Sequence, residues 1–191
     1  MKWVVSVALL VVGCGYGFSD KGPVVPATAH TVHVEVFTNR TRQYGLEVKL
    51  RRSIEDEFRR RGALKVLPER SAADVVLSGA IRSVQIIPVA SGPTDEPIAY
   101  RSVMTVAFRL LDRTSGRVLH ETPLLVDEQD FAAVSQVVIP TSPHFQQGTS
   151  DLEDLVTITN VQLGESRRNH ALSELVDQVA RDVYIRSVEG F

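Results

Sequence analysis

The stretch YRSVMTVAFRLLD, residues 100–112, alternates apolar and polar side chains over most of its length. A period of two predicts a β-strand with one face in a hydrophobic core and the other toward water. The predicted core face carries Tyr100, Met104, Val106, Phe108 and Leu110, and the outer face carries Arg101, Thr105 and Arg109. The turn DRTSG follows at 112–116, and residues 118–126 are predicted as the partner strand. The stretch therefore predicts a β-hairpin.

Further strands are predicted on the N-terminal side of this hairpin. Residues 30–37, HTVHVEVF, show the same alternation, and residues 64–67 are predicted to return alongside them. Residues 73–90 are rich in β-branched side chains, which favour strands. Within that segment, Gly79 indicates a bulge or a point of close backbone approach.

Between the strands at 30–37 and 64–67, apolar side chains recur at every fourth position. These side chains are Leu46, Leu50, Ile54 and Phe58. Such spacing predicts an amphipathic helix that buries one stripe. Gly62 is expected to end this helix, and Asn39 or Thr41 to cap its beginning.

The C-terminal part of the chain has a less regular pattern, followed by a second helix. Residues 127–163 contain two prolines and no sustained period, so they are interpreted as an irregular, partly extended loop with room for a helical turn. A helix is then predicted from about 165–169 almost to the C-terminus, because its apolar residues follow three-four spacing. They are Leu172, Leu175, Val176, Val179, Val183 and Tyr184.

This order of elements predicts a two-layer α+β fold. Each predicted helix has a single apolar stripe to bury, and the economical solution places both helices on one face of the sheet. We therefore expect a small mixed β-sheet of four to five strands with two amphipathic helices packed on one face.

The N-terminus has the layout of a secretory signal, with Lys2 followed by an apolar run at 3–12. This run is too short to cross a bilayer, which takes ~20 apolar residues. Residues 11–14, VVGC, resemble the bacterial lipobox, in which a diacylglycerol is attached to the cysteine thiol and the peptide is cut just before it. Cys14 is therefore predicted as the lipid attachment site. An intermolecular disulfide is the alternative for this single cysteine.

The lipobox resemblance divides the chain into three parts. Residues 1–13 are the predicted signal peptide, residues 14–29 a lipidated tether, and residues 30–191 a single periplasmic domain. The residue after the cysteine is Gly15 rather than aspartate, which in the sorting rule of such lipoproteins implies the outer membrane. We expect the domain at its periplasmic face, held by the N-terminal lipid anchor.

Composition and motifs argue against several classes of function. A formal net charge of -2 and a pI near 6.2 argue against a nucleic-acid binder, which is expected to be basic. His30 and His33 would lie on opposite faces of a strand, and the other histidines are scattered, so no metal site is predicted. No nucleophile elbow or phosphate-cradling glycine loop is present. We expect no cofactor and no enzymatic activity.

Arginines supply the candidate ligand site. The densest cluster, residues 50–62, is interleaved with Glu55, Asp56 and Glu57 and is interpreted as a solvated helix face. Arg82, Arg101 and Arg109 are instead predicted to project from the face of the sheet that the helices leave open. Guanidinium groups bind phosphate through a bidentate fork, although exposed arginines on strands are also common without a ligand.

Together these segments resemble the LPS-assembly lipoproteins of the LptE type. The resemblance rests on CGYGF at 14–18 and on the segments at 34–62, 73–84 and 100–119, with the closing amphipathic helix. It implies a non-enzymatic lipoprotein that plugs an LptD-type outer-membrane β-barrel and assists insertion of lipopolysaccharide into the outer leaflet. It also implies lipopolysaccharide binding through basic residues. The choice of Arg82, Arg101 and Arg109 comes from strand geometry and not from the family.

Two other interpretations stay open at this point. The pattern V-x-V-x-x-F-x-N-x-T at 32–41 is similar to that of lipoproteins that activate peptidoglycan synthases or take part in a secretion pore. An envelope hydrolase is the other interpretation, and no motif supports it. The identity of the partner protein separates the first from an LPS-assembly role.

Overall fold

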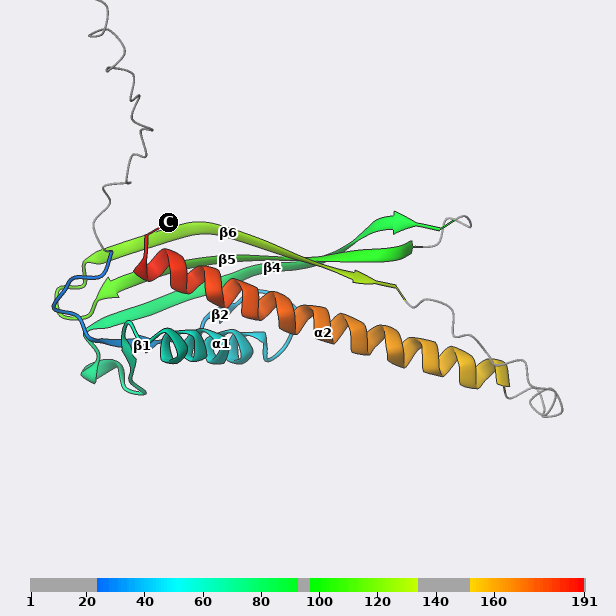
Figure 1. Cartoon of the computed structure of the whole chain (residues 1–191), viewed down its shortest axis with the longest axis horizontal. Coiled ribbons are helices and arrows are strands. Elements are labelled where there is room, and N and C mark those ends of the chain that lie inside the picture. The colour runs from blue at the N-terminus through cyan, green and yellow to red at the C-terminus, as the bar shows by residue number, and fades with distance from the viewer. Residues whose placement is uncertain (1–23, 93–96, 134–151, 191) are drawn as a thin grey trace, which may run out of the picture.

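The computed structural model describes residues 24–92, 97–133 and 152–190. Cys14, the predicted signal peptide and most of the predicted tether lie outside these residues. The chain forms a mixed β-sheet with two helices, which confirms the predicted α+β class (Figure 1).

The sheet has six strands, and their order is β3-β1-β4-β5-β6, with β2 also beside β4. The strands are β1 Thr31–Val34, β2 Thr38–Asn39, β3 Lys65–Val66, β4 Val75–Ser91, β5 Pro97–Asp112 and β6 Val118–Ala132. The strand β1 pairs in parallel with β3 and with β4, and β2 pairs in parallel with β4, whereas β4, β5 and β6 form an antiparallel meander. The prediction of four to five strands misses β2, a two-residue strand that continues the line of β1 along β4.

The helix α1, Leu46–Arg61, lies between β1 and β3 in the chain, as the four-residue spacing predicts. Gly62 ends it in the left-handed conformation with φ 72°, and its N–H donates to the carbonyl of Phe58 at 2.9 Å. The predicted cap is wrong, because Gly45 occupies the N-cap position without a side-chain hydrogen bond. Asn39 instead donates from Nδ2 to the carbonyl of Gln43 and to Glu47, and so holds the loop that enters the helix.

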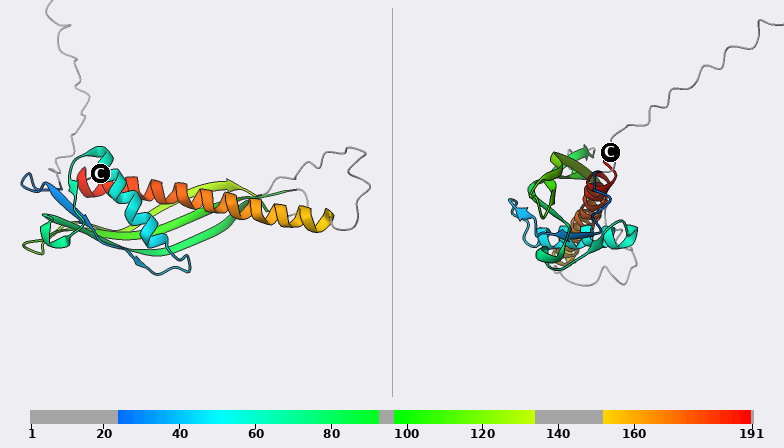
Figure 2. Two further views of the ribbon diagram at one scale, coloured as in Figure 1. Left: turned by 90° about the horizontal axis from the view of Figure 1, so that it is seen from below. Right: turned by 90° about the vertical axis from the view of Figure 1, so that its left-hand side faces the viewer.

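The helix α2, Leu152–Val188, packs with α1 on one side of the sheet (Figure 2). Side chains of both helices join those of the strands in one hydrophobic cluster, which includes Phe58, Leu77, Met104 and Val179. Short η1, Arg70–Ala72, precedes β4. Among the described residues, no helix is both long enough and apolar enough to span a bilayer.

The irregular loop predicted at 127–163 is wrong at both of its ends, and its middle, residues 134–151, lies outside the described residues. The strand β6 runs on through Ala132, and α2 already begins at Leu152, well before residue 165. Asp127, two residues after Leu125, is buried on the core face of β6. A charged residue at this position interrupts the alternation of apolar and polar side chains that would otherwise indicate the strand. The first turns of α2 contain β-branched residues such as Thr157 and Thr159, whose helix propensity is low.

Gly79 marks a close approach, one of the two predicted alternatives. A Cβ at this position would lie 2.4 Å from Phe37 Cε1 and 2.5 Å from the carbonyl oxygen of Ala107. The bulge lies elsewhere, because the register of β4 against β5 shifts between Ile81 and Ser83. Arg82 is the extra residue at this shift.

Candidate functional site

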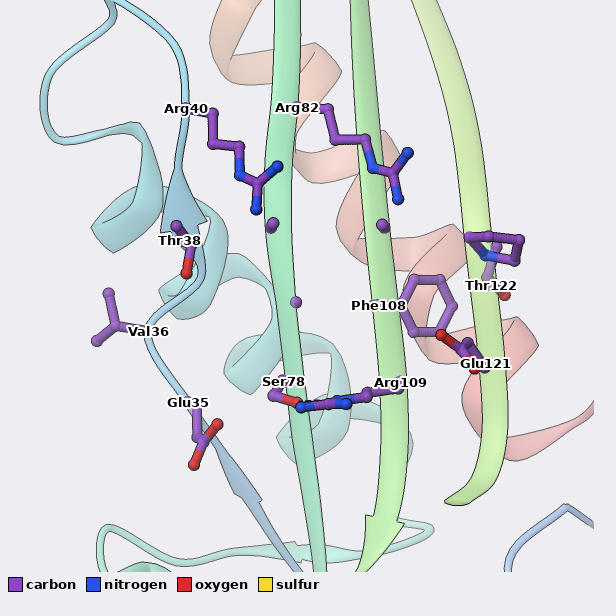
Figure 3. A pocket seen from close by; sticks show the side chains of 14 residues that line it. Glu35, Val36, Thr38, Arg40, Ser78, Arg82, Phe108, Arg109, Glu121 and Thr122 are labelled. Carbon is purple, nitrogen blue, oxygen red and sulfur yellow. Dashed lines mark hydrogen bonds between the residues drawn. The ribbon is translucent and has the colours of Figure 1, made fainter.

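The face of the sheet that the helices leave open carries a groove of about 440 Å³ (Figure 3). Its floor is made of the small residues Ser78, Gly79, Ala80 and Ala107 on β4 and β5. The chain from β1 through β2 forms one side, and β6 forms the other. Small residues at the floor leave room for a ligand above the backbone.

Three arginines line this groove: Arg40, Arg82 and Arg109. Arg82 projects from the bulge of β4, which turns its side chain to the open face. Arg109 lies opposite Ser78 in the register, and its Nε donates to Ser78 Oγ at 3.4 Å. Figure 3 shows the side chains of Arg40 and Arg82 extending over the same end of the groove, with Arg109 across its other end.

Arg40 is a residue that the sequence reasoning missed. It follows directly after β2, and its backbone N–H donates to the carbonyl of Ile81 at 3.0 Å. This bond holds Arg40 beside the β4 bulge, next to Arg82. No local pattern indicates this position, because it depends on the parallel pairing of Thr38 and Asn39 with β4.

The three arginines of the groove have exposed side chains and form no ion pair within the described residues. Two carboxylates, Glu35 and Glu121, lie at the end near Arg109. Glu35 is already paired with Arg70 on η1. The end near Arg40 and Arg82 therefore has guanidinium groups that are free to bind an anion.

Arg101 lies on the same face but outside the groove, and it is engaged by carboxylates. Its Nε and Nη2 donate to Asp130 at 2.6 and 3.0 Å, and Nη1 lies 2.6 Å from Glu128 Oε2. These bonds raise the pKa of Arg101 further above its ordinary range, with Asp130 as the main cause. The structure thus brings Arg82 and Arg109 together but leaves Arg101 apart from them.

The basic cluster on α1 is paired within the helix. Arg51 and Arg59 bond Glu55, and Arg60 and Arg61 bond Glu57. Burial raises the pKa of Glu57, but the hydrogen bonds from Arg60 and Arg61 outweigh it and lower the pKa below its ordinary value. This interleaving agrees with the interpretation of a solvated helix face.

No group of three or more histidine, cysteine, aspartate or glutamate side chains that could hold a metal ion occurs in the part of the chain that the structure describes. His33 places Nδ1 3.0 Å from the carbonyl oxygen of Leu67, and His120 places Nε2 2.9 Å from Thr122 Oγ1. Both rings thus have local hydrogen-bond partners. The open face presents exposed guanidinium groups, a chemistry that suits the binding of an anion.

Comparison with known proteins relates most of the chain to one family. The sequence profile of LptE, described as lipopolysaccharide-assembly, matches residues 29–187. Comparison with curated protein sequences gives no significant match.

Solved structures give remote similarities. PelC from Paraburkholderia phytofirmans, solved as a dodecamer, is 15% identical with a TM-score of 0.43, covering 82% of this chain and 90% of its own. An uncharacterised lipoprotein B from Nitrosomonas europaea is 15% identical with a TM-score of 0.45, covering 88% and 91%. The rare lipoprotein B from Shewanella oneidensis is 17% identical with a TM-score of 0.36, covering 76% and 98%.

Proposed function

This chain belongs to the LptE family of lipopolysaccharide-assembly proteins, and we propose from that membership that it is an outer-membrane lipoprotein that binds an LptD-type β-barrel. In this role it assists the insertion of lipopolysaccharide into the outer leaflet. Family membership makes it a lipoprotein of the bacterial envelope from a family without catalytic function. We propose that the protein itself catalyses no reaction.

The observation that carries the proposal is the set of unpaired arginines in the groove. Lipopolysaccharide presents phosphate groups on its lipid A part, and a guanidinium group binds phosphate through two parallel hydrogen bonds. Arg40 and Arg82 extend over one end of the groove without a carboxylate partner in the described chain, so an anion there meets no competing internal ion pair. We assign the phosphate contacts to Arg40, Arg82 and Arg109.

The first described residue and the proposed barrel contact lie at opposite ends of the described domain. Val24, the first described residue, lies beside Gly190, whereas the distal ends of β4 and β5 reach the other end (Figure 1). These distal ends expose Ile87, Val89 and Ile98 to solvent. Large apolar side chains that are exposed together at one end of a sheet are candidates for contact with a protein partner. A lipid on Cys14 would hold the protein at the membrane while this apolar end reaches the barrel.

A binding experiment with purified lipopolysaccharide tests the ligand assignment. The variant R40Q/R82Q/R109Q is expected to bind at least ~10-fold more weakly, since hydrogen bonds to charged groups contribute ≈1.5–3 kcal/mol each. The matched control is R52Q/R117Q/R181Q, which removes three exposed arginines outside the groove and so changes the net charge by the same amount. This control is expected to keep more affinity than the groove variant. Equal affinity of the groove variant and the wild type contradicts the assignment.

A further inference from the structure

Exposed aliphatic side chains flank the arginine groove on the open face of the sheet. On one side lies Val36, which is 52% exposed, and on the other lie Leu124 and Val126, which are 59% and 47% exposed. Val126 is the cross-strand partner of Thr105 and therefore shares the open face with it. We call Leu124, Val126 and the neighbouring Val103 the aliphatic patch.

The aliphatic patch lies next to the end of the groove that carries Arg40 and Arg82, and at the same height along the strands. The register places Ser83, directly after Arg82, opposite Thr105, and Thr105 opposite Val126. Arg82 and Val126 are thus two strands apart, and their backbones are separated by about 10 Å, since neighbouring strands lie ≈ 4.7–4.9 Å apart. The surface between them consists of Thr105 and Ala107, which are small enough to let a chain pass.

This patch is not needed for the core of the protein. Both helices pack on the other side of the sheet, and the hydrophobic cluster takes its residues from that side. Single exposed apolar residues are common on protein surfaces, whereas neighbouring exposed aliphatic side chains on one face can hold an apolar ligand. Here it adjoins arginines that have no ion-pair partner in the described chain.

We propose that the open face binds a phosphorylated lipid in two parts, with its phosphate between Arg40 and Arg82 and an acyl chain across Leu124 and Val126. This inference rests on the proposed function and adds an acyl subsite to it. Charge complementarity selects the ligand, because free guanidinium groups beside aliphatic side chains match an anionic head attached to a hydrocarbon chain. A free phosphate ion would leave the patch unused.

Alkyl phosphates of increasing chain length, each below its micelle concentration, test this proposal by calorimetric titration of the whole protein. Octyl phosphate is expected to bind about tenfold or more tightly than butyl phosphate, because each fully buried methylene contributes ≈ 0.8 kcal/mol and a chain lying on a flat face buries only part of that. L124S/V126S should remove this dependence on chain length and leave the affinity for inorganic phosphate unchanged. V48S, at an exposed valine on α1, is the matched control and should preserve the dependence.

The outcomes separate this inference from the proposed function when lipopolysaccharide binding is measured on the same samples. Equal affinity for inorganic, butyl and octyl phosphate overturns the acyl subsite, and retained lipopolysaccharide binding then leaves the proposed function standing. Equal binding of octyl phosphate and uncharged octyl maltoside also overturns the two-part site. If the wild-type protein binds none of these ligands, including lipopolysaccharide, both the acyl subsite and the proposed function are overturned.

Discussion

Arg101 and Asp130 lie directly opposite each other on β5 and β6, and the guanidinium donates to both carboxylate oxygens, at 2.6 and 3.0 Å. Arg82, on the same face of the sheet, forms no ion pair with a carboxylate of the described residues. The two arginines are alike in sequence context but differ in what their neighbours offer. Only the second is free to bind a ligand without first breaking an ion pair.

This difference predicts that R101Q leaves lipopolysaccharide binding within about twofold of the wild type, whereas R82Q lowers it. The reason is that Arg101 already uses its donors on Asp130 and Glu128. The measurement is a pair of titrations at the same ionic strength, since binding between charged groups depends on salt. A larger loss of lipopolysaccharide affinity for R101Q than for R82Q would contradict this prediction and place the binding site nearer the distal end of β5.

Gly79→Ala is expected to destabilise the domain by about 2 kcal/mol, as overpacking of a filled core usually does. The new Cβ would meet Phe37 Cε1 at 2.4 Å and the backbone oxygen of Ala107 at 2.5 Å, and the backbone cannot easily move away. Urea unfolding measures this change, and S78A on the same strand should shift stability by less than about 0.5 kcal/mol. An unchanged midpoint for G79A would contradict the packing of Phe37 over Gly79.

Buried Asp127 predicts a stability that falls as the pH rises. Burial, with a contribution from Asp182, raises the pKa of Asp127 above its ordinary value of 3.8. The folded state therefore binds more protons than the unfolded state, and stability is lost as pH rises from the unfolded pKa through the folded one. In addition, Oδ2 of Asp127 has no hydrogen-bond partner among the residues that the structure describes.

D127N should therefore be more stable than the wild type at pH 7 by about 1 kcal/mol, the lower end of the cost of an unsatisfied buried group. The advantage should vanish near pH 3, where the wild-type carboxyl is protonated. Urea unfolding from pH 3 to 7 measures it. D130N is the control, and its effect on stability at pH 7 should have the opposite sign. The hydrogen bond from Arg101 lowers the pKa of Asp130, so the charged carboxyl stabilises the fold there. A stability difference for D127N that is independent of pH would contradict this account.

The exposed apolar end of the sheet predicts a variant that folds but loses its barrel. I98D places a charge at a side chain that is 53% exposed, so the fold should tolerate it. Its copurification with an outer-membrane barrel should fall severalfold, because a charge there must be desolvated in the complex. V48D on α1 serves as the control. Unchanged copurification of I98D would place the contact elsewhere on the surface.

The proposed lipid anchor is tested by Cys14→Ser. Without the thiol no diacylglycerol can be attached, so the protein should lose the mass of its acyl groups and leave the membrane fraction. One chain gives only marginal membrane binding, whereas two or more hold a protein stably. Sucrose-gradient fractionation and intact-mass measurement give the result. C14S protein that stays in the outer membrane at wild-type level, without its barrel, would contradict the anchor.

Local periodicity was enough to predict α1 and β5, because each has one continuous apolar face, while β-branched composition indicated β4 and Gly62 indicated the end of α1. The start of α2 and the end of β6 were missed where that signal is interrupted by Asp127 and by β-branched residues. Arg40 was missed for a different reason: it reaches the groove through the pairing of β2 with β4, which joins residues about 40 positions apart. Register and ion pairing across strands, as between Arg101 and Asp130, are long-range properties that alternation does not contain.

The most direct test of the central claim is a mild-detergent pull-down of the tagged, lipidated protein from its native envelope, with the copurifying proteins identified by mass spectrometry. An LPS-assembly role predicts a stoichiometric large β-barrel of the LptD type together with lipopolysaccharide. A peptidoglycan synthase or a secretion pore at stoichiometric amounts, with no such barrel, would contradict it.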